Sequence, residues 1–372
     1  MEGLIIENNK PDNHLKYWVA YSRIQKIGPV NFKKLIDFFS DLKMAWQASQ
    51  KQLISAGLDE NLASEIIIQR QEINPEEEMA LMARENVQAV ILTDDNYPSN
   101  LKEIFNPPPV LYYRGSIDFL KNTCLAVVGT RKFSSYGQQA TAEIVSQLAK
   151  SGLTIISGLA FGIDAMAHKA CLEAGGKTIA ILGSGPDKQC VFPSSNRYIA
   201  DKIINAGGGL IAEYPIGTYP TKYTFPMRNR IISGLSKAVL IIEAPKSSGS
   251  LITARYGLDQ NRDIFALPGS IYSANSQGTN NLIKEGAKLI TSADDILQEL
   301  NIQTVFEKLK SQPQIDNNEE KIVLDLLSKE PMHIDKIKKM SKLNINVLLS
   351  TLTIMEIKSL IKDLGGKNYI RN

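Results

Sequence analysis

Apolar residues in the first 82 positions recur at helical spacing. Trp18, Tyr21 and Ile24 lie three residues apart, and the breaker Gly28-Pro29 separates them from a second run with the same period. A further pair of apolar runs lies on either side of Gly57. The pattern predicts a helical domain over residues 1–82, built from helices joined by short glycine turns.

These glycine turns leave two interpretations of the helical domain open. Paired helices joined in this way resemble helix-hairpin-helix and SAM-like units, in which turn amides can contact a DNA phosphate. A small bundle that serves packing or protein contact fits equally well, because the second glycine of the usual hairpin turn is missing.

A proline-rich stretch with a short strand expected at residues 110–113 opens the second domain. Beyond it, short apolar runs rich in β-branched residues alternate with stretches long enough for a helix. The runs are residues 125–128, 153–156, 177–182, 209–213, 238–242 and 263–267. They are typical of a parallel sheet covered on both faces, so residues 83–305 are expected to form an extended Rossmann-like, doubly wound α/β domain. In that architecture, ligands bind beyond the carboxyl ends of the strands.

The last part of the chain has the outline of a winged helix. Residues 306–318 are polar and predict a linker. Helices are expected at residues 322–327, 334–340 and 345–355, followed by a turn and a strand at 365–370. Three helices and a terminal hairpin in this order predict a winged-helix domain over residues 319–372.

Composition narrows the classes of function. The 372 residues include 42 Lys+Arg and 39 Asp+Glu, a formal charge of +3, which excludes a generally basic surface but not a local basic groove. No apolar run approaches the roughly 18–20 residues of a membrane helix, and the start does not resemble a signal peptide. We therefore expect a cytoplasmic protein without membrane contact. Three scattered cysteines and three histidines match no ligand spacing, so we expect neither a metal nor a cofactor.

The loop after the first parallel strand argues against a bound dinucleotide. A dinucleotide needs bare glycine backbone beside its pyrophosphate, but Gly129 is followed here by Thr130 and Arg131. Arg131 instead offers a planar, permanently charged group to a phosphate, and Gly129 permits the tight turn.

Two further loops carry small residues suited to anions. Ser157 and Gly158 follow the second parallel strand, and Ser247, Gly249 and Ser250 precede a helix after the fifth. The lysine of a P-loop is missing, so ATP hydrolysis is not expected.

Two titratable residues near the second loop have structural interpretations. Asp164 fits a helix N-cap better than an acid–base role. His168, inside the predicted helix, fits a packed or surface residue better than a catalytic one.

The segment between Glu213 and Glu243 contains no acidic residue. Its cations and rings alternate: Tyr219, Lys222, Tyr223, Phe225, Arg228, Arg230 and Lys237. Cations that follow a backbone, interleaved with rings on which bases stack, are what sequence-tolerant single-strand binding needs. The alternative is a solvated loop whose rings pack inward.

These residues together resemble the DNA-processing protein A family, also called DprA or Smf. The resemblance rests on residues 97–98, 108–111, 127–131, 157–164, 225–236 and 248–254, which span nearly the whole central domain in the family's order. The helical and winged-helix units match the family's three-part layout.

The resemblance implies a non-enzymatic protein that binds single-stranded DNA taken up in natural transformation, forms a homodimer and loads the RecA recombinase onto the strand. It implies that Arg131 grips a phosphate and that Lys222 and Phe225 form the family's Lys-x-x-Phe pair. Supporting contacts would come from Arg228, Asn229 and Arg230. The partner of the winged-helix tail stays open between duplex DNA and protein.

Two other functions stay open from the residues alone. Related Rossmann-like folds serve nucleoside-monophosphate phosphoribohydrolases, in which Glu243 and Arg131 would be catalytic, although the PGGxGTxxE motif is missing. The other is a duplex-DNA regulator acting through the winged helix. Its expected recognition helix, residues 344–355, contains no Lys or Arg, which disfavours major-groove readout.

Overall fold

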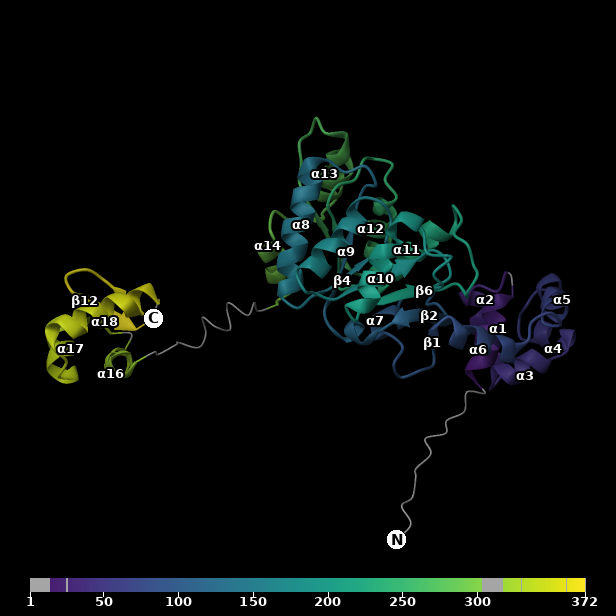
Figure 1. Cartoon of the computed structure of the whole chain (residues 1–372), viewed down its shortest axis with the longest axis horizontal. Helices are drawn as coiled ribbons and strands as arrows, with labels where there is room; N and C mark the ends of the chain where they lie inside the picture. The colour runs from purple at the N-terminus through teal and green to yellow at the C-terminus, as the bar shows by residue number, and fades with distance from the viewer. Residues whose placement is uncertain (1–13, 25, 303–316, 329, 359, 372) are drawn as a thin grey trace, which may run out of the picture. The chain divides into compact units, whose positions relative to one another are not determined.

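The computed structural model describes residues 14–24, 26–302, 317–328, 330–358 and 360–371. These residues fall into two compact units, Met1–Glu299 and Leu300–Asn372, which we treat one at a time (Figure 1). The predicted linker at residues 306–318 lies almost wholly outside the described residues, as do the first 13 residues of the predicted helical domain.

The first unit begins with short helices whose starts are set by local signals. Pro29 takes the first position of its helix after Gly28, Ser49 and Gln52 form a reciprocal capping box, and Asp59 caps the next helix. The helices are α1 (Leu15–Arg23), α2 (Pro29–Phe38), α3 (Leu42–Gln47), α4 (Gln50–Ser55), α5 (Glu60–Gln69) and α6 (Pro75–Arg84). The helical prediction for this region is confirmed.

Nine strands of the described residues form one mixed sheet in the order β1-β2-β6-β5-β4-β3-β7-β8-β9. Their bounds are β1 (Gln88–Ile91), β2 (Val110–Gly115), β3 (Cys124–Val128), β4 (Thr154–Ser157), β5 (Thr178–Leu182), β6 (Gly209–Ala212), β7 (Ala238–Ile241), β8 (Asp263–Ala266) and β9 (Lys288–Leu289). All pairings from β6 to β9 are parallel, so the predicted doubly wound sheet is confirmed.

The sheet differs from the prediction at its edges. Strand β2 pairs antiparallel with β6, and β1 pairs antiparallel with β2. The sequence predicted part of β2 but not β1 or β9. Strand β9 has only two residues, and β1 is buried at only two of its four positions, so neither produces the continuous apolar run of a central strand.

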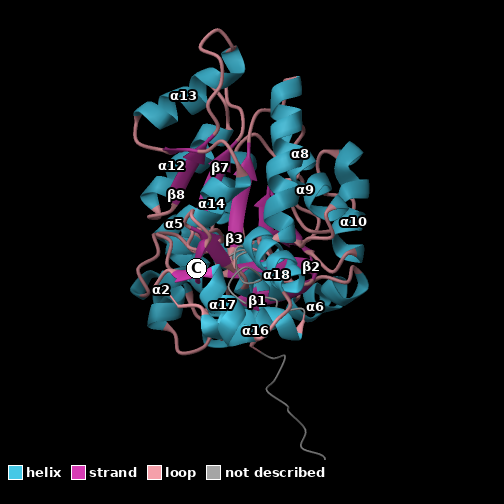
Figure 2. Cartoon of the chain, turned by 90° about the vertical axis from the view of Figure 1, so that its left-hand side faces the viewer, coloured by secondary structure: helices cyan, strands magenta, loops and turns pink. Residues whose placement is uncertain are grey.

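Helices cover both faces of the sheet (Figure 2). Helices α8 (Ser135–Lys150), α9 (Ile163–Glu173) and α10 (Arg197–Asn205) pack side by side, and α11 (Thr224–Gly234) packs against α12 (Ser250–Asp259). Alternate residues of β5 enter different cores: Ala180 and Leu182 join the cluster around α10, whereas Ile179 and Ile181 join the cluster around α11. Burial on both faces explains the unbroken apolar runs. The remaining helices are α7 (Ser99–Lys102), α13 (Gln277–Lys284) and α14 (Ala293–Glu299).

The N-terminal helices share a core with the sheet. Trp18 and Phe32, whose ring centroids are 5.5 Å apart, belong to the same buried cluster as Tyr112 of β2. The Tyr112 hydroxyl also lies 2.5 Å from Ser22 Oγ. The predicted boundary between residues 82 and 83 therefore falls inside one compact unit, just before the end of α6.

The second unit is a winged helix, as predicted. Its elements are α16 (Asn318–Leu326), β10 (Met332–His333), α17 (Ile334–Ser341), α18 (Ile345–Ile357), β11 (Ile361–Asp363) and β12 (Asn368–Arg371). The strands form a separate sheet in the order β10-β12-β11, and the helices enclose a core of their own.

Across the residues that the structure describes, no helix combines the length and apolarity needed to cross a bilayer.

A substitution that creates a cavity in the core of the winged helix should destabilise that unit alone. Leu352 is buried in the same cluster as Val323 and Ile337, and Leu352→Ala should lower that unit's free energy of unfolding by about 2–5 kcal/mol. Calorimetry of the full chain should show the winged-helix transition shifted or lost, with the transition of the first unit unchanged. An equal shift of every transition would contradict separate cores.

Candidate functional site

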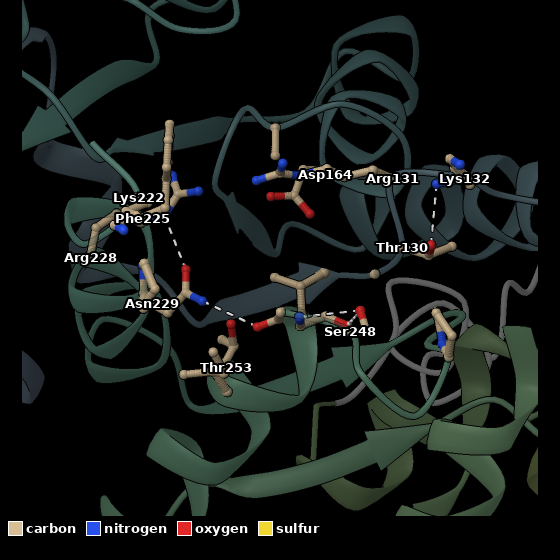
Figure 3. Close-up of a pocket in the computed structure, with 18 of the residues that line it drawn as sticks. Thr130, Arg131, Lys132, Asp164, Lys222, Phe225, Arg228, Asn229, Ser248 and Thr253 are labelled. Carbon is tan, nitrogen blue, oxygen red and sulfur yellow. Dashed lines mark hydrogen bonds between the residues drawn. The ribbon is translucent and has the colours of Figure 1, made fainter. Parts of the chain in front are cut away.

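A cavity of about 850 Å³ lies beyond the carboxyl ends of the parallel strands. Loops that follow β3, β4, β5, β6 and β7 line it (Figure 3). Strand β3 is the point at which the strand order reverses, because β4 lies on one side of it and β7 on the other. The cavity thus occupies the ligand position expected for a doubly wound sheet.

Close approach of two loops positions Arg131. A Cβ atom on Gly129 would lie 2.6 Å from Ile163 Cγ1, and one on Gly162, whose φ is +80°, would lie 2.3 Å from the Thr130 carbonyl oxygen. Both positions therefore require glycine. The Thr130 amide donates to the Glu243 carbonyl oxygen at 2.7 Å, which ties the loop after β3 to the end of β7. Arg131 is left exposed at the rim.

Lys222 and Phe225 lie at the start of α11. The Thr221 amide donates to Thr224 Oγ1 at 2.9 Å, and this turn places Lys222 just before the helix. The Arg131 guanidinium carbon is 5.9 Å from the centroid of the Phe225 ring. The structure therefore brings together one exposed cation from the β3 loop, one from the start of α11, and an aromatic ring.

Arg228 lines the cavity but also supports its wall. Its guanidinium is buried and donates to the carbonyl oxygens of Gly158, at 2.6 Å, and Ile181. Burial lowers the pKa of Arg228 to about 10, despite the opposing charge of Asp164. The buried Asp164 carboxylate accepts from the Gly158 amide at 3.1 Å, and burial raises its pKa. Together, Arg228 and Asp164 fix the loop after β4.

Asp164 does not form the predicted N-cap. Gly162 precedes α9, so Asp164 is the second residue of the helix. Its carboxylate reaches back to the preceding loop instead of capping its own helix.

The start of α12 supplies the opposite wall. Asn229 Nδ2 donates to the Gly249 carbonyl oxygen at 3.4 Å, while Asn229 Oδ1 accepts from Arg228 Nε at 3.1 Å. Ser248 Oγ and Ser250 Oγ are 2.7 Å apart. These residues, together with Gly249, line the cavity at a helix N-terminus, where amides and hydroxyls favour an anion.

Four predicted site residues do not line the cavity. Ser157 is fully buried and its hydroxyl donates to the Val127 carbonyl oxygen at 2.7 Å. The Gly158 amide donates to Asp164, and its carbonyl oxygen accepts from Arg228. Arg230 is buried in an ion pair with Glu213, and Ser247 is exposed outside the cavity. The expected roles of Ser157 and Gly158 are corrected here because their polar groups bond inside the protein. That of Arg230 is corrected because its guanidinium is buried beside Glu213 and away from the cavity, although its Nε and Nη1 have no hydrogen-bond partner in the part of the chain that the structure describes.

Other lining residues were missed by the sequence reasoning: Thr130, Lys132, Phe192, Ser248, Thr253 and Asn275. Lys132 and Ser248 are direct neighbours of predicted residues, so a broader reading of the same loops would have included them. Phe192 lies far from the other aromatic residues in sequence, yet its ring centroid is 5.6 Å from that of Phe225.

Glu243, the acid that a phosphoribohydrolase would need, is engaged elsewhere. Its buried carboxylate accepts from the Ser134 amide at 2.9 Å and from Ser134 Oγ at 2.6 Å. Glu243 does not line the cavity. The carboxylate that does, Asp164, is held by the loop amide of Gly158.

The histidine of α9 and the three cysteines are buried. His168 is buried with Nδ1 2.6 Å from Thr178 Oγ1, which confirms a packed histidine. Cys124, Cys171 and Cys190 are free, and burial raises each thiol pKa to about 12. Within the described residues, no group of three or more His, Cys, Asp and Glu side chains could hold a metal ion.

Fold and cavity together define a Rossmann-like protein whose switch-point site is cationic and aromatic. Residues 88–301 match the family described as DNA recombination-mediator protein A, and residues 307–367 match the DprA winged helix domain. The chain belongs to this DprA/Smf family.

The similarity extends over the full length of one relative. Protein Smf from Synechocystis sp. is 36% identical over 95% of this chain and 98% of its own length. The X-ray structure of DNA processing protein A from Streptococcus pneumoniae has a TM-score of 0.66 and 35% identity, covering 78% of this chain and 98% of that one. DNA processing protein A from Helicobacter pylori, described for its unique mode of binding single-stranded DNA, has a TM-score of 0.52 and 30% identity, covering 57% and 95%.

The buried histidine should make stability depend on pH. Burial lowers the pKa of His168 from 6.5 to about 3, so the unfolded state binds more protons between these values. The contribution is complete above pH 6.5 and is lost as the pH falls toward 3. Urea unfolding at pH 7 and pH 5 should differ by about 2 kcal/mol from this group, and His168→Gln should remove that part of the difference. An unchanged pH dependence in the variant would refute the assignment.

Proposed function

We propose that this protein binds single-stranded DNA in the cavity and acts without catalysing a reaction. One observation carries the proposal: exposed Arg131 and Lys222 flank Phe225 at the mouth of the cavity. Among the described residues, no carboxylate forms an ion pair with either cation, so both charges are free for phosphates. Phosphate contact and base stacking are the two terms of sequence-tolerant strand binding.

The ring geometry favours a single strand over a duplex. Phe225 and Phe192 are tilted by 49° and form one aromatic wall of the cavity. Such rings stack on unpaired bases, whereas the bases of a duplex are already stacked on one another. The opposite wall, with Ser248, Gly249 and Ser250 at the start of α12, supplies donors for a second phosphate.

Binding fits this site better than hydrolysis of a nucleotide. The Glu243 carboxylate is buried against Ser134, and Asp164 is buried against a loop amide. Both carboxylates already accept hydrogen bonds from the protein, which favours a structural role over that of a free acid or base. Release of a base from nucleoside monophosphates by the purified protein would favour the phosphoribohydrolase alternative.

We extend the proposal to the roles implied by the family. The protein would receive DNA during natural transformation, act as a homodimer in the cytoplasm and load RecA onto the bound strand. Support comes from membership of a family described as a DNA recombination mediator and from relatives named DNA processing proteins. The partner of the winged helix would be duplex DNA or a protein.

Charge reversal at the cavity mouth should abolish strand binding. Arg131→Glu and Lys222→Glu should each weaken binding of oligo-dT by roughly 10- to 100-fold, because a charge-assisted phosphate contact is replaced by repulsion. Combined, they should remove measurable binding while the thermal unfolding curve stays the same. Lys51→Glu, an exposed lysine on α4, is the matched control. Unchanged affinity of the double variant at low salt would sink the proposal.

Removing the Phe225 ring should weaken binding of oligo-dT without changing how that binding depends on salt. Phe225→Ala should weaken oligo-dT binding by roughly 5- to 150-fold, the effect of one lost base stack, while the slope of log affinity against log salt stays constant. Phe225→Tyr should retain most of the affinity. Fluorescence anisotropy over a salt series measures both quantities, and a slope that falls with the ring would contradict a stacking role.

A further inference from the structure

A second group of exposed rings and cations lies beside the cavity, on the α9–α10 side of the first unit. Phe161, Phe192 and Tyr198 are 46%, 45% and 47% exposed, although large rings are usually buried. Lys169 of α9 and Lys202 of α10 are also exposed. We refer to Phe161, Lys169, Phe192, Tyr198 and Lys202 as the outer track.

The outer track is continuous with the cavity. Phe192 belongs to both, since its ring faces Phe225 inside the cavity. Asn196 Nδ2 donates to the Leu159 carbonyl oxygen at 2.9 Å and to that of Ala160 at 3.3 Å. This side chain joins the segment that carries Phe192 to the loop that carries Phe161. Ala160, the residue before Phe161, lines the cavity together with Phe192, so both segments reach its rim.

Farther from the cavity, Tyr198 lies between two cations. Lys169 Nζ is 5.4 Å from the centroid of its ring and Lys202 Nζ is 5.8 Å away. Helices α9 and α10 pack against each other, so the three side chains form one surface (Figure 2). The arrangement resembles the cavity mouth, where Arg131 lies over the Phe225 ring and Lys222 lies over the Tyr223 ring.

Two acidic residues lie near these cations, Glu173 on α9, which is exposed, and Asp201 on α10. Asp201, the acidic residue on α10, is 3.5 Å from Lys188 Nζ. Arg197 is not available to a ligand in the same way, because its guanidinium donates to the carbonyl oxygens of Gln189 and Val191. Lys169 and Lys202, by contrast, form no ion pair among the described residues.

We infer that single-stranded DNA leaving the cavity continues over the outer track, with bases stacked on Phe161 and Tyr198 and phosphates held by Lys169 and Lys202. This inference rests on the proposed function, since it assigns the next part of the same strand. Continuity with the cavity and charge complementarity identify the occupant as a polyanion with exposed aromatic faces. A protein partner would not require cations on both sides of an exposed ring.

The outer track can be tested by comparing oligo-dT strands of two lengths, because only a long strand would reach it. An oligo-dT of about 6 nucleotides would fill the cavity, and one of about 20 would also reach the outer track. The triple variant Lys169→Gln, Tyr198→Ala, Lys202→Gln should bind the short strand as the native protein does. It should bind the long strand roughly 10- to 100-fold more weakly, with a salt slope reduced by about 1.4, which corresponds to two phosphate contacts.

Two further variants separate the causes. Tyr198→Phe keeps the ring and should retain long-strand affinity. Lys43→Gln combined with Lys51→Gln removes the same charge from α3 and α4, and should leave both strands bound. If this control loses as much affinity for the long strand as the triple variant does, the effect is one of general charge and the assignment of the outer track is overturned.

Failure of the track and failure of the proposed function look different. If the triple variant binds the long strand normally while the double variant Arg131→Glu, Lys222→Glu loses binding of both strands, the outer track is refuted and the cavity assignment stands. If the native protein binds neither strand, both are refuted. A protein partner is indicated if the triple variant binds both strands normally but loses co-purification with a second protein, and that result also overturns the track.

Discussion

The cavity depends on one buried guanidinium. Arg228 extends from α11 to the carbonyl oxygens of Gly158 and Ile181, which belong to the ends of β4 and β5. A buried charge is costly unless its donors are satisfied and an opposite charge lies nearby, and Asp164 supplies that charge. The pair holds a helix from one face of the sheet against the loop after β4 and the carboxyl end of β5. Lys222, Phe225 and Asn229 all take their positions from this anchored helix.

The near-zero formal charge of the chain hides one segment in which positive charges are concentrated. The chain has a formal charge of +3, but four cations lie between residues 214 and 242 without an acidic neighbour in sequence. The structure divides these cations by role. Lys222 stays exposed at the cavity. Arg228 is buried and donates to backbone carbonyl oxygens, and Arg230 is buried in an ion pair with Glu213. The free positive potential at the mouth therefore comes from Arg131, Lys132 and Lys222 rather than from the arginines of α11.

The three-part layout also changes in the structure. The winged helix has a core of its own, which agrees with its prediction as a separate domain. The N-terminal helices do not, since Trp18 and Phe32 share a buried cluster with Tyr112 of the sheet. A pattern of helical spacing cannot reveal this, because it shows which face of a helix is apolar but not what covers that face. These helices therefore belong to the same compact unit as the sheet.

The sequence by itself determined the helical regions, the central strands and the edge of the sheet at which a ligand would bind, but not the edge strands β1 and β9. Unbroken apolar runs marked the central strands, and the loops after them contained Arg131, Lys222 and Phe225 at the cavity now seen. Only the tertiary structure decided which polar groups remain free. Arg228 and Arg230 are two residues apart, so on a helix they point in directions about 200° apart and meet different partners. Ser157 and Ser248 look alike in sequence, but the first bonds inside the sheet and the second faces the cavity. Hydrogen-bond partners come from distant strands and helices, so local sequence cannot show whether a side chain is already satisfied.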